Sequence, residues 1–265
     1  KITKYADRLI DDLETVDYLP HIKKQQIDWI GRSEGAEVQF KLADSDDVIT
    51  VFTTRLDTIF SGAFVILAPE HPIIKKLELR IKNSGEVQDY IEASKKLTDR
   101  ERQENQEITG VELQGIQVIN PATGTALPVW VANFVLAQYG TGGVFADAHD
   151  QRDFDLAKAH HIPLTVSIKP TEESLWPSIE KLETCYEGEA TLVNSKQFDG
   201  MTSAEARVKI LAWLQQQGLA QGKVNYKLRD WIFSRQHYWG EPIPMTHCDH
   251  CKEVVESTPH QLNFR

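Results

Sequence analysis

The sequence predicts an α+β domain built on a curled sheet or a β-barrel, with helices around it. Two observations predict this fold class. Short apolar runs with a period of two recur between residues 33 and 224, and helical patterns interrupt them without the regular strand–helix alternation of a parallel α/β fold. With 41% hydrophobic and 26% charged residues, the composition is that of a globular protein, which excludes collagen-like and disordered classes.

The first segment predicts an amphipathic helix that ends before Pro20. Its apolar stripe consists of Ile2, Tyr5, Ala6, Leu9, Ile10 and Leu13. No capping residue precedes this helix, so we expect the chain to be a piece of a larger protein.

The remaining elements follow from changes of apolar period and from turn residues. We expect strands at residues 36–42, 48–52, 63–68, 111–118, 128–131, 134–137, 144–146 and 191–193. We expect helices within residues 83–108 and at residues 153–161 and 202–217, the last capped by Thr202 or Ser203.

Charge and cysteine content limit the classes of function and the compartment that fit this sequence. The 29 Lys and Arg residues against 39 Asp and Glu residues give a net charge of −10, which argues against non-specific nucleic-acid binding but not against a local site. Three cysteines (Cys185, Cys248 and Cys251) are too few for a disulfide framework, so we expect a reducing compartment, the cytoplasm. No apolar run is long enough for a membrane span, and the charged N-terminus is unlike a signal peptide.

Hydroxyl and charged groups gather at Thr53–Thr58, directly after a predicted strand. This array suits the positioning of a water molecule and of a ribose or carbonyl oxygen. The alternative is an ordinary Ser/Thr turn that leaves the strand, with Arg55 and Asp57 as a surface pair.

A second array, His149–Asp153, lies between a predicted strand and a helix. One carboxylate could hold a ligand ammonium through a charged hydrogen bond. The structural alternative makes Asp150 or Asp153 the cap or a first-turn residue of the helix. A metal site of His149 and Asp150 with His160 or His161 is a weaker alternative, because no second histidine lies four residues from the first.

Three further patterns have structural explanations. The glycine loop Tyr139–Gly143 fits neither nucleotide-binding pattern and suits a tight turn. Gly31–Gly35 has the spacing of a serine nucleophile elbow, but there a strand must precede the serine, and here a strand follows it. Cys248 and Cys251 form half of a zinc site, which needs four ligands.

Taken together, five ordered segments resemble the bacterial-type leucyl-tRNA synthetases, a family of class I aminoacyl-tRNA synthetases. They are Lys1–Leu9, Trp29–Gly35, Thr53–Thr58, the loop Tyr139–Gly142 with Ala148–Asp153, and Leu228–Trp231 with Ser234–Gly240. The resemblance implies an editing domain (connective peptide 1) at residues 33–224, inserted in a catalytic domain that contributes residues 1–32 and 225–265.

The resemblance also implies post-transfer editing, the hydrolysis of norvaline, isoleucine and methionine esters of tRNA(Leu). A methylene gives only about 10–200-fold discrimination in an apolar pocket, so a second, hydrolytic site is needed. The catalytic residues implied are Thr53 and Thr54, which would orient the terminal adenosine and the water, and Asp153, which would bind the α-ammonium. The substrate-binding residues implied are Arg55, Asp57, Thr58, Tyr139, Phe145, His149, Asp150 and Arg152, with Thr58 rejecting leucine.

The implied partners are the 3′ end of tRNA(Leu) and the rest of a synthetase chain, in a monomer. No cofactor and no metal are expected for editing. The ATP-handling strings His-x-Gly-His and Lys-Met-Ser-Lys-Ser do not occur in the sequence, so ATP and magnesium would belong to the parent catalytic domain.

Two departures from the family pattern predict a reshaped pocket. Leu56 stands where proline is usual, and Ala146–Ala148 is one residue shorter and places Asp147 near the pocket. The alternative from another class is a module that binds the tRNA 3′ end and has lost hydrolysis.

Overall fold

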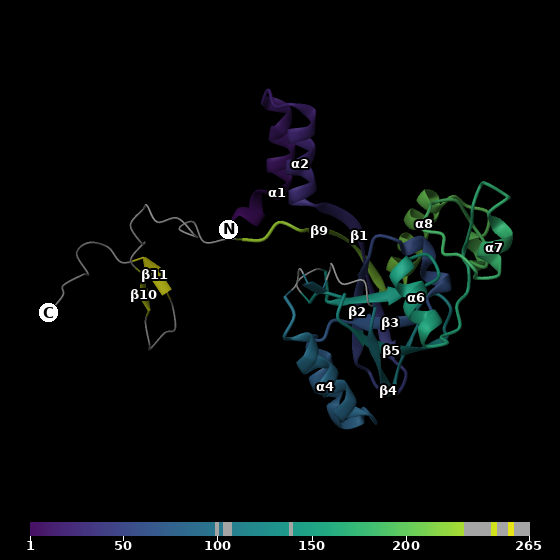
Figure 1. The fold of residues 1–265 in the computed structure, drawn as a ribbon. Helices are drawn as coiled ribbons and strands as arrows, with labels where there is room; N and C mark the ends of the chain where they lie inside the picture. The colour runs from purple at the N-terminus through teal and green to yellow at the C-terminus, as the bar shows by residue number, and fades with distance from the viewer. Residues whose placement is uncertain (99–100, 103–107, 138–139, 231–244, 248–253, 257–265) are drawn as a thin grey trace.

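The computed structural model describes residues 1–98, 101–102, 108–137, 140–230, 245–247 and 254–256. In this part of the chain a seven-stranded mixed sheet is surrounded by helices, as Figure 1 shows. The mixture of α and β elements agrees with the prediction.

Six strands follow the order β2-β1-β4-β5-β3-β6, and β9 pairs with β1. All pairs are antiparallel except β3 with β5. Their bounds are β1 Arg32–Leu42, β2 Val48–Thr53, β3 Phe64–Leu67, β4 Gly110–Ile119, β5 Ala126–Ala132, β6 Gly143–Ala146 and β9 Ala220–Tyr226. Two short pairs stand outside this sheet: β7 Ile168–Lys169 with β8 Thr191–Leu192, and β10 Met245–His247 with β11 Val254–Glu256.

The end strands β2 and β6 approach each other without pairing. A Cβ built on Gly143 of β6 would lie 3.5 Å from the backbone oxygen of Thr50 of β2, yet no ladder joins the two strands among the described residues. The sheet is therefore open, and the barrel-like closure that we expected is not confirmed.

The α-helices are α1 Ala6–Asp11, α2 Pro20–Ile30, α3 Pro72–Leu77, α4 Ser84–Ser94, α6 Gln151–Ala159, α7 Trp176–Glu180 and α8 Ser203–Gln216. The 3-10 helices are η1 Ile2–Tyr5, η2 Asp12–Thr15, η3 Leu56–Ser61, η4 Glu78–Arg80 and η5 Lys196–Phe198. The cap of α8 is confirmed, because Thr202 Oγ1 accepts from the Glu205 amide and the Glu205 carboxylate accepts from the Thr202 amide.

Both faces of the sheet are buried, which explains the continuous apolar run of β3. Val65 and Leu67 point into the larger core, which α8 also covers. Phe64 and Ile66 point to the other face, where Leu156 of α6 packs. Every residue of β3 is inaccessible to solvent, so no alternation of polar residues appears in its sequence.

Two predicted elements are wrong in detail. The first helix is divided into η1, α1 and η2, and Pro20 begins α2 because its missing amide proton is no loss at a first helical position. Residues 134–137 form no strand: they are a turn, in which the Val135 amide donates to Ala132. The strand β9 was not expected.

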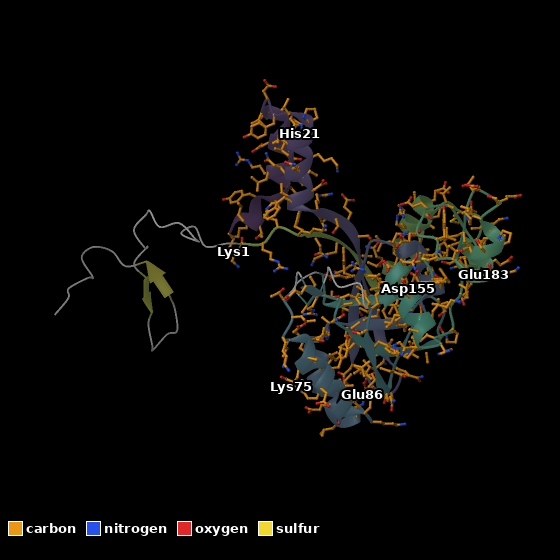
Figure 2. The ribbon with its side chains drawn as sticks, in the orientation of Figure 1. Lys1, His21, Lys75, Glu86, Asp155 and Glu183 are labelled. Atoms are coloured by element: carbon orange, nitrogen blue, oxygen red, sulfur yellow. The ribbon has the colours of Figure 1, made fainter. Side chains whose placement is uncertain are left out.

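The helices α1 and α2 stand apart from the sheet, with His21 at their far end, and β1 and β9 run between them and the sheet (Figures 1 and 2). Ala6, Ile30 and Leu228 form a small apolar cluster at this junction. Polar contacts reinforce it: Arg32 Nε lies 2.9 Å from Asp7, and the Thr3 amide donates to Asp230 at 3.0 Å. No helix among the described residues is long and apolar enough to cross a membrane.

Phe40 of β1 tests the assignment of the core. Its side chain is fully buried, and the centroid of its ring lies 6.2 Å from that of Phe145. Phe40→Ala leaves a cavity, so we expect the free energy of unfolding to fall by about 3–5 kcal/mol. Val208→Ala, at a residue of α8 that is 70% exposed, is the control and is expected to change it by less than about 0.5 kcal/mol. Urea denaturation measures both, and equal losses would contradict the assignment of the core.

Candidate functional site

A cavity of about 780 Å³ opens where β2 and β6 end and α6 begins. Nine of the predicted site residues line it: Thr53, Thr54, Arg55, Thr58, Phe145, His149, Asp150, Arg152 and Asp153. Two segments about 90 residues apart in the sequence thus meet in one place. Asp57 does not line the cavity, and Tyr139 lies outside the described residues.

The turn after β2 has the form that the structural alternative predicted. Thr53 Oγ1 accepts a hydrogen bond from the Arg55 amide at 2.9 Å, which fixes the backbone as the strand ends. This bond uses only a lone pair, so the Thr53 hydroxyl keeps its proton for another acceptor. Thr54 is exposed at the cavity.

Arg55 and Asp57 are not the surface pair that the sequence suggested. Asp57 is fully buried, and the Arg55 guanidinium meets its two oxygens at 3.3 Å each. A second guanidinium, of Arg207 on α8, lies 3.5 Å from the same carboxylate. A buried carboxylate is stable only with such partners. Because one partner lies in the turn after β2 and the other on α8, Asp57 connects these two elements, which is a structural role.

Arg55 also anchors a distant loop. Its guanidinium donates to the backbone oxygens of Glu187 at 2.8 Å and Gly188 at 3.3 Å. The Glu187 carboxylate in turn accepts from the Gln151 amide in the first turn of α6, at 3.1 Å. Sequence reasoning missed Glu187 because nothing near it in the chain marks it as part of the site.

His149 is fully engaged by backbone groups. Its Nε2 accepts from the amides of Ser167 at 2.9 Å and Ile168 at 3.2 Å, and its Nδ1 lies 2.9 Å from the Tyr186 carbonyl oxygen. Since Nε2 accepts, Nδ1 must carry the proton and the ring is neutral. Burial lowers the pKa of His149, which agrees with this state. The ring therefore orders the surrounding loops and offers no free lone pair to a metal.

Asp150 caps α6, as the structural alternative predicted. Its Oδ1 accepts from the amides of Arg152 at 2.9 Å and Asp153 at 3.2 Å, while the rest of the side chain is exposed. Among the described residues no group of three or more His, Cys, Asp or Glu side chains is arranged to hold a metal ion.

Asp153, in the first turn of the same helix, has a different environment. Its side chain is buried at the cavity wall. Burial, followed by the nearby charges of Asp150 and Asp147, raises the pKa of Asp153 well above its ordinary value. A positively charged group entering the cavity would reverse this effect and stabilise the carboxylate.

Aromatic side chains form the apolar wall. Phe145 of β6 and Phe52 of β2 both line the cavity. Gly140, with a φ of +61°, approaches so closely that a Cβ there would lie 2.8 Å from the Cβ of Phe52. The glycine loop therefore has a structural reason that does not involve a ligand.

Cys185 lies near the site, with its Sγ 3.4 Å from the Ala148 carbonyl oxygen. Burial and the surrounding carboxylates raise the pKa of its thiol to about 12. Cys248 and Cys251, the proposed half of a zinc site, lie outside the described residues.

Sequence reasoning also missed the far rim of the cavity. It is lined by Tyr226, Lys227, Leu228 and Arg229, at and beyond the end of β9. The sequence shows the basic residues of this segment, but only the pairing of β9 with β1 places them beside the cavity.

Comparison with known proteins identifies similar chains. A family model described as "Leucyl-tRNA synthetase, editing domain" matches residues 27–215. The leucine–tRNA ligase of Alkaliphilus oremlandii is 45% identical over 255 residues, which are 95% of this chain and 31% of that protein. The alpha subunit of the Aquifex aeolicus leucine–tRNA ligase is 43% identical over an alignment 283 residues long with its gaps, which covers 96% of this chain and 44% of the subunit.

A solved structure is similar as well. It is the ternary complex of the Agrobacterium radiobacter K84 agnB2 LeuRS with tRNA and LeuAMS, with a TM-score of 0.76 and 35% sequence identity. The similarity covers 99% of this chain and 29% of that one. The chain thus spans less than half the length of the relatives described here.

The raised pKa of Asp153 predicts that replacing its carboxyl with a neutral side chain increases the free energy of unfolding. Above about pH 4 the unfolded chain releases the proton of this carboxyl, while the folded chain, with its raised pKa, retains it. The free energy of unfolding therefore falls as the pH rises towards the folded pKa. Asp153→Asn removes this loss, so we expect the variant to be more stable than the wild type at pH 7, with the difference vanishing near pH 4.

Urea denaturation at both pH values measures the effect. Asp155→Asn makes the same chemical change on the exposed side of α6, where Figure 2 labels Asp155, and serves as the matched control. We expect it to shift stability by less than about 0.5 kcal/mol at either pH. A less stable Asp153→Asn variant at pH 7 would contradict the argument.

Proposed function

The chain belongs to the family of leucyl-tRNA synthetase editing domains, and from this premise we propose that it hydrolyses tRNA(Leu) carrying a wrong amino acid. The substrates proposed are the norvaline, isoleucine and methionine esters. The rest of a synthetase, which would attach leucine with ATP and magnesium, is the proposed parent. A cytoplasmic monomer is part of the same proposal.

The observation that carries the proposal is the buried Asp153 carboxyl in the cavity wall. The α-ammonium of an aminoacyl ester would supply the charge that this group lacks. A charged hydrogen bond of this kind contributes about 1.5–3 kcal/mol. Because the carboxyl lies at one wall, it would also fix the orientation of the ester.

Hydroxyl groups support the hydrolytic step. The ester is already activated, so attack needs a positioned water and donors for the developing oxyanion, not a covalent nucleophile. The free hydroxyl proton of Thr53 and the exposed hydroxyl of Thr54 are available for these roles and for the terminal ribose. Thr58, which is 1% exposed and lines the cavity, would occupy the volume that a leucine side chain requires.

The rim of the cavity offers charges for the RNA, although the whole chain is acidic. Arg152, Lys227 and Arg229 are exposed and line the cavity. Cations at the mouth would attract the terminal phosphates, while the acidic remainder of the surface would disfavour RNA elsewhere. This distribution suits a domain that takes only the 3′ end.

One observation favours hydrolysis over the alternative, a module that binds the 3′ end without cleaving. Leu56, the departure from proline, is 3% exposed and packs into the main core at the start of η3. Its burial would restrain the turn in place of the fixed φ of proline. The Thr53–Thr58 segment therefore keeps an ordered form without that residue.

Deacylation tests the proposal. We expect the chain to hydrolyse norvalyl- and isoleucyl-tRNA(Leu) and to spare leucyl-tRNA(Leu). Asp153→Ala removes the ammonium site and is expected to lower kcat/KM for the norvalyl ester by about 10²-fold or more. Asp155→Ala, on the exposed side of the same helix, is the control and should leave the rate near that of the wild type.

Two outcomes would contradict this proposal. Binding of the 3′ end without turnover would favour the module that has lost hydrolysis. Loss of turnover on addition of EDTA would favour the metal-dependent alternative, whereas we expect EDTA to have no effect.

The basic residues at the rim of the cavity lead to a second prediction, which concerns tRNA binding. Arg152→Gln removes one cation from the cavity mouth, so we expect weaker binding of deacylated tRNA(Leu) and a salt dependence, log Kd against log [salt], that is shallower by up to about one unit. Lys75→Gln is the control, because Lys75 is exposed on α3 and does not line the cavity (Figure 2). Equal effects of the two substitutions would show that RNA binds the surface without regard to the cavity.

A further inference from the structure

A buried arginine lies behind one wall of the cavity and has no role in the proposed mechanism. Arg102 is 4% exposed and does not line the cavity. Its amide donates to the Thr98 carbonyl oxygen at 3.0 Å, next to a reciprocal pair of hydrogen bonds between Thr98 and Glu101. These bonds fix the backbone that carries the side chain. A buried guanidinium needs acceptors for its protons, so the acceptors indicate what the residue does.

The guanidinium of Arg102 holds the turn that follows β5. Its Nε donates to the Asn133 carbonyl oxygen at 2.6 Å, and its Nη2 donates to the Val135 carbonyl oxygen at 2.9 Å. Asn133 and Val135 are both buried, and buried carbonyl groups in a turn need donors from elsewhere in the chain. Arg102 supplies both donors from one side chain.

The same turn is held on a second side by α4. The Asn133 amide donates to the hydroxyl of Tyr90 at 3.1 Å, and that hydroxyl donates to the Thr109 carbonyl oxygen at 2.8 Å. The hydrogen bond within the turn, from the Val135 amide to the Ala132 carbonyl oxygen, is long at 3.4 Å. The position of the turn therefore depends on side chains from outside it.

This turn is part of the cavity wall. Phe134, Val135 and Leu136 all line the cavity, and they extend the apolar surface of Phe52 and Phe145. Arg102 bonds the backbone of this segment from behind the wall. A change at Arg102 would thus reach a ligand through the position of the turn, without any direct contact.

Glu70, which follows β3, balances the charge of Arg102. Arg102 Nη1 donates to Glu70 Oε1 at 2.7 Å, and the Glu70 side chain is 36% exposed. A planar guanidinium meets two carbonyl oxygens and a carboxylate at once because its donors point in fixed directions, which a lysine ammonium cannot reproduce. A buried ion pair adds little stability compared with apolar packing, so stability alone is a weak reason for an arginine at this position.

We propose that Arg102 is a positioning residue, which bonds the carbonyl groups of Asn133 and Val135 and so holds the Phe134–Leu136 wall where the bound ester packs against it. The proposal rests on the proposed function of the site. An apolar wall contacts the ester in the ground state as well as in the transition state, so its displacement weakens both complexes equally. Such a loss raises KM and leaves kcat unchanged.

Two substitutions separate the position of the wall from the stability of the fold. Arg102→Lys keeps a charge beside Glu70 but loses the fork of donors that meets both carbonyl groups. Glu70→Gln keeps an acceptor for Nη1 and leaves the carbonyl contacts in place, but it removes the countercharge of a buried cation. The measurements are kcat and KM for norvalyl-tRNA(Leu), together with the urea midpoint of each variant.

We expect Arg102→Lys to raise KM by about tenfold and to change kcat by less than about threefold. Glu70→Gln is expected to lower the urea midpoint and to leave KM within about twofold of the wild type. Ile116→Val, in the larger core and not at the cavity, is the control that lowers the midpoint with an unchanged KM. A KM that followed the midpoint across all three variants, or an unchanged KM in Arg102→Lys, would overturn the proposal.

A second measurement does not depend on hydrolysis. With para-fluorophenylalanine in place of phenylalanine, the fluorine resonance of Phe134 reports the wall, and that of Phe198, packed against Phe60 in the larger core, is the reference. Phe134→Leu and Phe198→Leu assign the two signals. Arg102→Lys is expected to shift or broaden the Phe134 resonance alone, and Glu70→Gln to leave both unchanged. If the wild type hydrolysed no ester, the proposed function would fail, while an unmoved Phe134 resonance in Arg102→Lys would overturn the positioning role separately.

Discussion

The site depends on one buried ionic interaction, in which the guanidinium groups of Arg55 and Arg207 meet the carboxylate of Asp57. Asp57 has no access to solvent, so a carboxylate left there without these two cations would carry a large desolvation cost. The interaction fastens the turn after β2 to α8, and Arg55 extends it to the loop at Glu187. One wall of the cavity is thus held in place by an ionic interaction whose carboxylate is buried behind it.

The opposite wall shows how burial assigns different tasks to similar side chains. Asp147, Asp150 and Asp153 lie within seven residues. Asp150 is exposed and caps α6, whereas the other two are buried and have raised pKa values. Asp153 lines the cavity and suits a cationic ligand, whereas the Asp147 side chain accepts a hydrogen bond from the His149 amide. Exposure and partners, not residue type, distinguish the three.

The elements that were predicted correctly carry a signal within their own sequence. The period of two marked β1 from Ala36 onwards, and a Thr or Ser cap marked the start of α8. The Asp57 interaction could not be predicted in this way, because Arg207 is 150 residues away in the sequence. The same holds for His149, whose backbone partners at residues 167, 168 and 186 give no signal in side-chain chemistry. Residues 134–137 resembled a strand because all four side chains are apolar, although only Val135 among them is buried.

The pairing of β1 with β9 has a consequence for how such a domain can be moved between proteins. Arg32 and Tyr226 are cross-strand partners, so the two points at which the chain enters and leaves the sheet are adjacent. A unit whose ends meet can be placed within a surface loop of another fold at a low entropic cost, because it barely separates the ends of that loop. The close ends of β1 and β9 would therefore let this segment of the chain join a surface loop of another fold at two neighbouring points.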